Sequence, residues 1–156
     1  MTAVPRCIIE PLSLPSEIDD ILAVEEASFT SPWTRDMYLA ELDNKGVSHF
    51  YLARMPASRE VVGFCSFWKV LEELHINNLA VLPAHRRSRI GTDLLFRVLE
   101  DGAKLGAHRA TLEVRRSNVP AQQLYGKFGF TVAGVRRLYY SNPPEDALVL
   151  WRDGLP

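Results

Sequence analysis

The chain has 156 residues, 47% of them hydrophobic, and its 18 Lys and Arg residues nearly balance its 19 Asp and Glu residues, for a formal net charge of -1. This length is typical of one domain with a buried core, so we expect residues 1–156 to form a single domain. The balanced charge argues against direct nucleic-acid binding through a general positive field. The same balance argues against an acidic, disordered chain.

The basic residues are unevenly distributed. Arginine supplies 14 of the 18, and three arginines fall within four positions, at Arg86, Arg87 and Arg89. A guanidinium group binds phosphate and carboxylate in a planar, two-pronged geometry that lysine lacks. The sequence therefore predicts a local anion site inside a balanced protein.

The two cysteines and the apolar runs bear on the compartment. Cys7 and Cys65 each lie in an apolar run, which is typical of buried free thiols in a reducing environment. The first residues lack the pattern of a secretory signal, and no apolar run reaches the length of a membrane span. We expect a cytoplasmic protein that does not associate with membranes.

The first half of the chain predicts a strand, two helices and three strands. Residues 7–9 form a short apolar run closed by prolines, and apolar residues at helical spacing follow over 16–28. A second helix starts at Ser31-Pro32 or at Thr34 and ends near residue 46. The strands are expected at 50–53, 61–70 and 74–82.

The second half predicts alternating helices and strands. The strongest apolar stripe comprises Ile90, Leu94, Leu95, Val98, Leu99 and Leu105, and Gly106 stops this helix. A strand over 109–114 and a helix capped by Asn118 follow, then strands at 130–135 and 147–151 joined by a long polar connection. We expect an α/β fold with a mixed, mostly antiparallel sheet of six to seven strands, four helices, and parallel strands across both strand-helix-strand crossovers.

The loop between the strand at 74–82 and the strongest helix is suited to phosphate. Three arginines and Gly91 precede or begin the helix, where free backbone N–H groups and the positive end of the helix dipole meet. A solvated basic loop, with a glycine needed only for the turn, explains the same residues. The loop alone does not decide between them.

The order of motifs resembles the GNAT superfamily of N-acetyltransferases over nearly the whole chain. In that family the pattern Gln/Arg-x-x-Gly-x-Gly/Ala binds the pyrophosphate of acetyl-CoA. It aligns here with residues 86–91, where Arg89 replaces the first glycine. The resemblance implies a GNAT fold and acetyl-CoA as co-substrate, with the phosphates held by Arg86, Arg87, Ser88, Arg89, Ile90, Gly91 and Thr92.

Five further matches resemble the RimI-type alanine N-acetyltransferases of ribosomal proteins. They occur in the family's order, at residues 29–33, 78–83, 112–118, 121–125, and 136–140 with 145–147. The resemblance implies acetyl transfer to the N-terminal amine of a protein, in particular to an alanine of a ribosomal protein. Because a ternary complex holds amine and thioester together, direct attack suffices and Cys65 should be dispensable.

Two residues are candidates for the proton transfers. Glu113 interrupts an apolar strand, so it is either a base or the partner of Arg115 or Arg116 in an ion pair. The resemblance implies that it is the base, acting through water on an α-amine whose ordinary pKa is about 8. Tyr125 is by default a packing residue, and the resemblance implies that it is the acid that protonates the leaving thiolate.

The remaining candidates bind the two substrates. The resemblance implies that the backbone of Leu79, Ala80 and Val81 holds the pantetheine arm and polarises the thioester, although an ordinary core strand has the same side chains. Asn118 is a helix cap or a cofactor contact. The candidates for a peptide slot, which could equally form a small aromatic core, are Phe29, Trp33, Tyr139 and Tyr140.

Other readings remain open from the sequence. A GNAT enzyme could act on lysine side chains or small amines, and lysine, with an ordinary pKa of about 10.4, demands more of the base. Arg89 suggests a non-catalytic acyl-CoA-binding module, and the arginines could contact RNA. His49, His75, His85 and His108 show no metal-ligand spacing, so no metal is expected.

Overall fold

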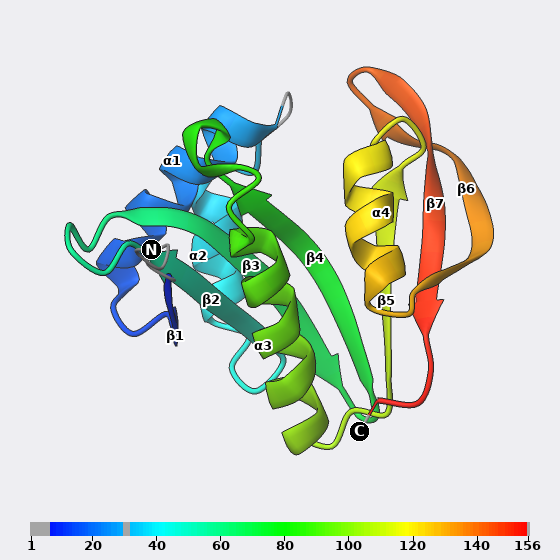
Figure 1. The fold of residues 1–156 in the computed structure, drawn as a ribbon, viewed down its shortest axis with the longest axis horizontal. Coiled ribbons are helices and arrows are strands. Elements are labelled where there is room, and N and C mark those ends of the chain that lie inside the picture. Colours follow the sequence, from blue (N-terminus) through cyan, green and yellow to red (C-terminus); the bar gives the residue numbers. More distant parts are fainter. Residues whose placement is uncertain (1–6, 30–31, 156) are drawn as a thin grey trace, which may run out of the picture.

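The computed structural model describes residues 7–29 and 32–155, and it consists of one seven-stranded sheet with helices on both faces (Figure 1). The strands are β1 (Ile8–Pro11), β2 (Ser48–Arg54), β3 (Val61–Val70), β4 (Glu73–Val81), β5 (Arg109–Arg115), β6 (Thr131–Ser141) and β7 (Pro144–Arg152). The α-helices are α1 (Ile18–Ser28), α2 (Arg35–Leu42), α3 (Ile90–Lys104) and α4 (Val119–Lys127), and 3-10 turns lie at η1 (Pro15–Glu17) and η2 (Pro83–His85).

The sheet is mostly antiparallel, and the strands across both strand-helix-strand crossovers run parallel, as expected, although only the first crossover joins neighbouring strands among those described. The strand order is β1-β2-β3-β4-β5-β7-β6, and β4 with β5 is the parallel pair. β6 does not pair with β5, because β7 lies between them and is antiparallel to both. The crossover from β5 through α4 therefore leads to β6 at the edge of the sheet. The β6–β7 hairpin then brings β7 back into the position between β5 and β6.

The expected polar connection after residue 135 is instead a continuation of strands. β6 runs to Ser141, β7 starts at Pro144, and a tight turn joins them. Most of β6 is exposed because it is the edge strand of the sheet. Such a strand does not need the apolar alternation by which a half-buried strand is recognised. The extended part of β6 was therefore not predicted from the sequence.

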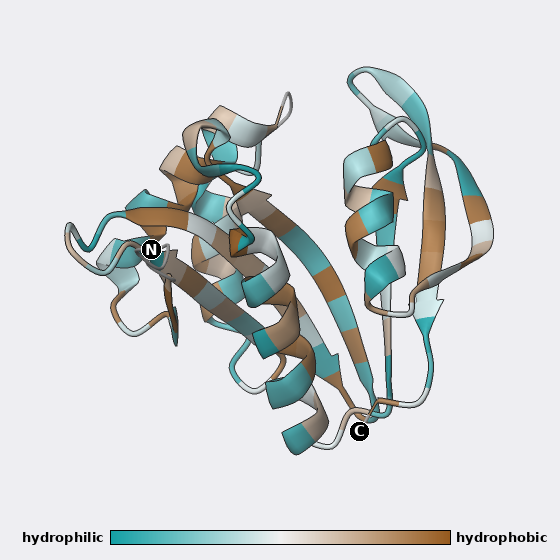
Figure 2. Ribbon diagram, viewed as in Figure 1, coloured by the Kyte–Doolittle hydropathy of each residue, from teal (hydrophilic) through white to brown (hydrophobic). Residues whose placement is uncertain are grey.

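α3 and α4 cover one face of the sheet. The predicted stripe of α3 is buried from Ile90 to Leu99 and packs against alternate residues of β4 and β5, such as Leu74 and Leu112. The alternation along β4 is visible as teal and brown bands in Figure 2. Leu105 is 50% exposed, contrary to the expected stripe, because α3 ends before it and the chain turns away at Gly106.

α1 and α2 cover the other face over β2, β3 and the end of β4. Ile18, Ile21 and Val24 of α1 and Tyr38 of α2 are fully buried there. Of the two predicted starts for α2, the helix uses Thr34, whose hydroxyl accepts a hydrogen bond from the Met37 N–H at 3.3 Å.

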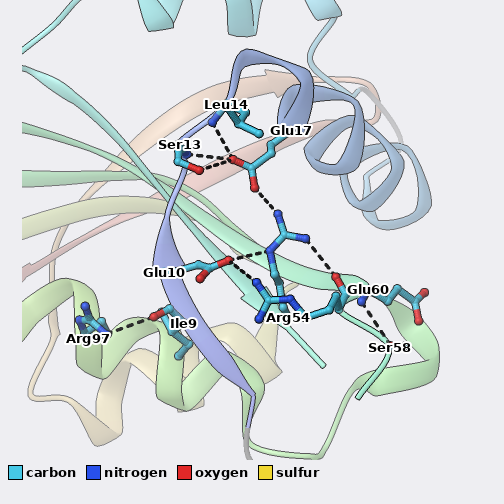
Figure 3. A network of polar contacts seen from close by, with 10 residues as sticks. Ile9, Glu10, Ser13, Leu14, Glu17, Arg54, Ser58, Glu60 and Arg97 are labelled. Carbon is cyan, nitrogen blue, oxygen red and sulfur yellow. Dashed lines mark hydrogen bonds and ion pairs between the residues drawn. The ribbon is translucent and has the colours of Figure 1, made fainter. Parts of the chain in front are cut away.

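A polar network ties the segment before α1 to the sheet (Figure 3). Arg54 on β2 donates to Glu10 on β1 at 2.8 Å, to the Arg59 carbonyl at 3.0 Å, and to Glu17. Glu17 also accepts from the N–H groups of Ser13 and Leu14, both at 2.8 Å. Burial alone would raise the pKa of Glu17, but these hydrogen bonds and the guanidinium outweigh burial and lower it.

Both cysteines are free thiols, Cys65 fully buried and Cys7 partly so. Within the described part of the chain, no helix is long and apolar enough to cross a bilayer.

Candidate active site

β4 and β5 separate part of the way along their length. They pair from Glu73 with Arg109 to Ile76 with Leu112, and the pairing stops there. A bulge in the ladder with β3 falls at the same level, because Phe67 pairs with Ile76 whereas the preceding residue, Ser66, pairs with Asn78 and not with Asn77. Figure 1 shows the two strands diverging beyond this point. A V-shaped opening in the middle of a sheet is the result.

The sequence-predicted backbone residues lie on this opening. Leu79, Ala80 and Val81 pair with β3 on one side, and no described strand pairs with them on the side toward β5. Backbone N–H and C=O groups seek hydrogen-bond partners. Apart from the Val81 carbonyl, which accepts a hydrogen bond from Arg86 Nε at 3.1 Å, those on the β5 side are therefore available to an extended ligand.

The arginine-rich turn lies between the open end of β4 and α3. Arg86 donates from Nε to the Val81 carbonyl at 3.1 Å, and the Ser88 hydroxyl donates to the His85 carbonyl. These two side chains shape the turn. Arg87 and Arg89 are exposed, and both have left-handed backbone, with φ of 65° and 68°.

The N-terminus of α3 fits a phosphate group. Arg89 is the N-cap residue and its side chain makes no capping hydrogen bond, so it does not occupy the first N–H groups of the helix. A Cβ at Gly91 would approach Leu124 to 3.6 Å and Val81 to 3.9 Å. These are ordinary van der Waals distances to apolar side chains, so the first turn of α3 lies close to the end of β4 and to α4. The free backbone donors and the positive side chains suit an anion.

Glu113 lies on β5 and points to the face opposite α3. Its Oε2 is 2.7 Å from Nε2 of His75 on β4, and its Oε1 is 3.6 Å from Nη2 of Arg136 on β6. The hydrogen bond from His75 is the main reason that the pKa of Glu113 is lowered, and it outweighs burial, which would raise it.

The ion-pair partners considered from the sequence were wrong. Arg115 pairs with Glu145 at 3.2 Å, and Arg116 with Asp146 at 3.7 Å. Arg115 lies two residues after Glu113 and so on the same face of β5, and Arg116 lies beyond the end of the strand. Both arginines reach acidic residues of the β6–β7 hairpin instead of Glu113.

Tyr125 on α4 is buried, with its ring 5.7 Å from that of Phe130. Burial is the main cause that raises its pKa, and the neighbouring Cys65 thiol and Tyr140 phenol add to it. The pKa of Tyr140 is raised to about 12, mainly by burial, and the negative charge of Glu113 contributes to this increase. Tyr140 therefore interacts electrostatically with both proposed proton-transfer groups.

The aromatic candidates fall into two pairs. Tyr139 and Tyr140 contact edge to face at 5.1 Å near the β6–β7 turn, and the guanidinium of Arg115 lies 4.2 Å from the Tyr140 ring. Trp33 packs 5.2 Å from Tyr38 at the margin of the α1/α2 core, as the alternative reading expected. Phe29 is 37% exposed after α1. Figure 1 places the β6–β7 turn at the same end of the molecule as the opening.

Asn118 caps α4, and its Oδ1 accepts from the Ala121 N–H at 3.2 Å. This confirms the capping prediction, and a cofactor contact stays a prediction. In the ranges 7–29 and 32–155, no group of three or more His, Cys, Asp and Glu side chains is placed to hold a metal ion.

Sequence reasoning missed His75, Arg136 and a second polar cluster. His75 stands between the buried Leu74 and Ile76, and this alternation on a strand beside Glu113 was the available signal. In the second cluster, the fully buried Glu25 accepts from the Tyr38 hydroxyl and from Asn78 Nδ2 at 3.3 Å. This cluster joins α1 and α2 to β4 directly before Leu79.

The fold and this opening in the sheet define an acetyltransferase. Residues 18–130 match the acetyltransferase (GNAT) family, and the chain belongs to that family. It is similar to the [ribosomal protein bS18]-alanine N-acetyltransferase of Escherichia coli (strain K12), with 30% identity over 81% of this chain and 84% of that protein. A protein of Bacillus subtilis (strain 168) provisionally assigned the same activity is 38% identical over 86% of this chain and 88% of its own length.

The solved structures agree with these sequence relatives. The crystal structure of the ribosomal-protein-S18-alanine N-acetyltransferase from Escherichia coli superposes with a TM-score of 0.86 at 25% identity, covering 96% of this chain and 95% of that one. The expected GNAT fold is confirmed.

Proposed function

We propose that this chain transfers the acetyl group of acetyl-CoA to the N-terminal α-amine of a ribosomal protein that begins with alanine. The observation that carries the proposal is the opening between β4 and β5, which has free strand edge and an anion-binding turn on one flank and Glu113 on the other. The names of the two sequence relatives support alanine as the acceptor and bS18 as the first protein to test.

Residues on the α3 side would hold acetyl-CoA, which supplies the activated acetyl group. The turn from Arg86 to Thr92 is suited to the phosphates by its cations and by the first N–H groups of α3. The edge of β4 from Leu79 to Val81 is suited to the amides of the pantetheine arm and to the thioester carbonyl. Asn118, at the start of α4, is a further candidate contact.

Residues on the face opposite α3, together with Tyr125 of α4, would receive the peptide and carry out the proton transfers. Glu113 takes the proton of the amine, directly or through water, and Tyr125 gives one to the departing sulfur. A raised pKa keeps Tyr125 in the protonated form that this role needs. Tyr139, Tyr140, Phe29 and Trp33 would line the slot for the first residues of the peptide. Direct attack in the ternary complex requires no enzyme nucleophile.

We further propose a cytoplasmic site of action, without direct nucleic-acid or membrane binding. The buried free thiol of Cys65 and the partly buried thiol of Cys7 are compatible with a reducing compartment. A ribosomal protein acceptor would be met in the same compartment.

Intact-mass measurement tests the proposal. The protein is incubated with acetyl-CoA and peptides that begin with Ala, Ser, Met or Gly, each with a free and with a blocked N-terminus and with an internal lysine. We expect a gain of one acetyl group on the free Ala peptide and none on its blocked form. A gain on the blocked form would indicate lysine acetylation, and no gain on any peptide would refute the proposed activity.

Tyr125→Phe tests the acid. The substitution keeps the ring that packs on Phe130 and removes only the hydroxyl, so stability should change little. We expect kcat to fall by about 10²-fold, at the lower end of general acid catalysis, with the KM for peptide unchanged. Full turnover in this variant would remove Tyr125 from the mechanism.

A further inference from the structure

The β6–β7 hairpin contains an irregularity beside the expected peptide slot. Arg136 on β6 pairs with Ala147 on β7, and the next pair toward the turn is Tyr140 with Glu145. Residues 137–139 of β6 therefore lie opposite Asp146 alone. This is a bulge with two extra residues in β6.

The bulge decides which side chain of β6 lies near Glu113. If the register at Arg136 continued regularly, Leu138 would lie opposite Glu145. The two extra residues place Tyr140 there instead, and an insertion of two keeps Tyr140 on the same face as Arg136. Arg136 lies 3.6 Å from Glu113 on that face. The bulge therefore brings a tyrosine to the face where the amine is expected.

The backbone at the centre of the bulge is strained. Leu138 has a φ of 49°, in the left-handed region that a leucine rarely adopts. Its side chain is 69% exposed, so burial of the leucine does not stabilise this conformation. Strained backbone persists only where surrounding contacts hold it, and such positions cluster at functional sites. The bulge therefore requires a contact to its backbone.

Asp146 makes this contact. Its Oδ1 accepts a hydrogen bond from the Leu138 N–H at 2.8 Å. Its carbonyl accepts from the Arg116 N–H at 3.1 Å, and its Oδ2 lies 3.7 Å from Nη1 of Arg116. The ion pair is long and the arginine is exposed, so it contributes less than the short hydrogen bond from an N–H to a carboxylate. Asp146 thus ties the bulge in β6 to the segment directly after β5.

We propose that Asp146 is a positioning residue for the acceptor peptide, because by holding the Leu138 N–H group it fixes the bulge that presents Tyr139 and Tyr140 to the slot. This proposal rests on the proposed function. Tyr139 is 49% exposed and its ring lies 5.1 Å from that of Tyr140, so a shift of the bulge moves both rings. The bulge belongs to the β6–β7 hairpin, whereas the anion-binding turn lies between β4 and α3. Loss of Asp146 should therefore raise the KM for peptide and spare the KM for acetyl-CoA.

Kinetics on the free alanine peptide test the proposal. Asp146→Ala removes the acceptor, and we expect the KM for peptide to rise about 10-fold, the size of one hydrogen bond to a charged group, with the KM for acetyl-CoA unchanged. Asp146→Asn keeps an acceptor oxygen in the same place and should stay within about 3-fold of wild type. Asp153→Ala is the control and should leave both KM values unchanged. It removes a carboxylate that also pairs with an arginine, Arg109 at 3.3 Å, just beyond the other end of β7.

Leu138→Pro breaks the same contact from the donor side. Proline has no N–H group and cannot adopt a φ of 49°, and it is tolerated on an edge strand such as β6. The KM for peptide should rise by about the same factor as in Asp146→Ala. Because both substitutions break one contact, the double variant should show no further rise, and additive effects would overturn the proposal.

Amide hydrogen exchange gives a readout that does not depend on turnover. Leu138 is exposed, so its amide would exchange freely without a partner. In wild-type protein we expect this amide to be protected about 10-fold or more, and Asp146→Ala should remove the protection. Asp146→Asn and Asp153→Ala should retain it.

The outcomes separate the role of Asp146 from the function. With wild-type protein active on the alanine peptide, an unchanged KM for peptide in Asp146→Ala would overturn the proposal and leave the function standing. Equal rises in Asp146→Ala and Asp146→Asn, an equal rise in the KM for acetyl-CoA, or an unprotected Leu138 amide in wild type would also overturn it. Wild-type protein that acetylates no α-amine would instead refute the function on which the proposal rests.

Discussion

Arg89 occupies a backbone conformation that favours glycine, and substitution there separates the effects of backbone and charge. Its φ is 68°, in the left-handed region, where a side chain costs about 1–2 kcal/mol. The residue is exposed and its side chain makes no capping hydrogen bond. Arg89→Gly removes both the strain and the charge, whereas Arg89→Ala removes the charge and keeps the strain.

The expected difference between these two variants follows from the backbone alone. Arg89→Gly should be more stable than Arg89→Ala by about 1 kcal/mol, reduced somewhat by the greater freedom of glycine in the unfolded chain. For a chain of this length that corresponds to about 2–4 °C in Tm. Urea denaturation and calorimetry measure it. Equal stability of the two variants would refute the assignment of left-handed strain to this position.

The same pair of variants reports on the ligand. If the guanidinium attracts phosphate, both variants should bind CoA about 2- to 5-fold more weakly at low ionic strength, as expected for an exposed ion pair. The loss should shrink as salt screens the interaction. Titration calorimetry at two salt concentrations distinguishes the loss of charge from an effect of the backbone. If the backbone conformation were the cause, Arg89→Ala would bind CoA more weakly and Arg89→Gly would not.

Three further outcomes are expected. Gly102→Ala should destabilise by about 1–3 kcal/mol, because its Cβ would lie 2.3 Å from the nearest methyl of the fully buried Leu74, and combining it with Leu74→Ala should remove most of the added cost in a urea-denaturation cycle. Arg54→Met should cost about 2–3 kcal/mol at pH 7 through the lost contacts of the guanidinium with Glu17 and Glu10. Because the pKa of Glu17 is lowered, the part of that difference that comes from Glu17 should be fully present above the ordinary glutamate pKa of about 4.3 and be lost as pH falls through the lowered value. A difference that does not change with pH would contradict this account. Cys65→Ala should lose about 1 kcal/mol of stability and keep kcat, whereas loss of kcat in a folded variant would indicate a covalent intermediate.

Local sequence signals determined most of the elements of this protein. Apolar spacing in α3, glycine at its end and the cap at Asn118 each act within a few residues, so the chain itself specifies them. The order of strands, helices and motifs was enough to indicate the family.

The tertiary structure decided which residues meet. β6 was underestimated because an exposed edge strand carries little apolar pattern, and β7 took the place beside β5 that the crossover suggested for β6. Glu113 stood out as a carboxylate in an apolar strand, but its partners His75 and Arg136 come from positions 38 residues before and 23 after it. Pairing of that kind depends on strand register and on the point where β4 leaves β5, which no local pattern contains.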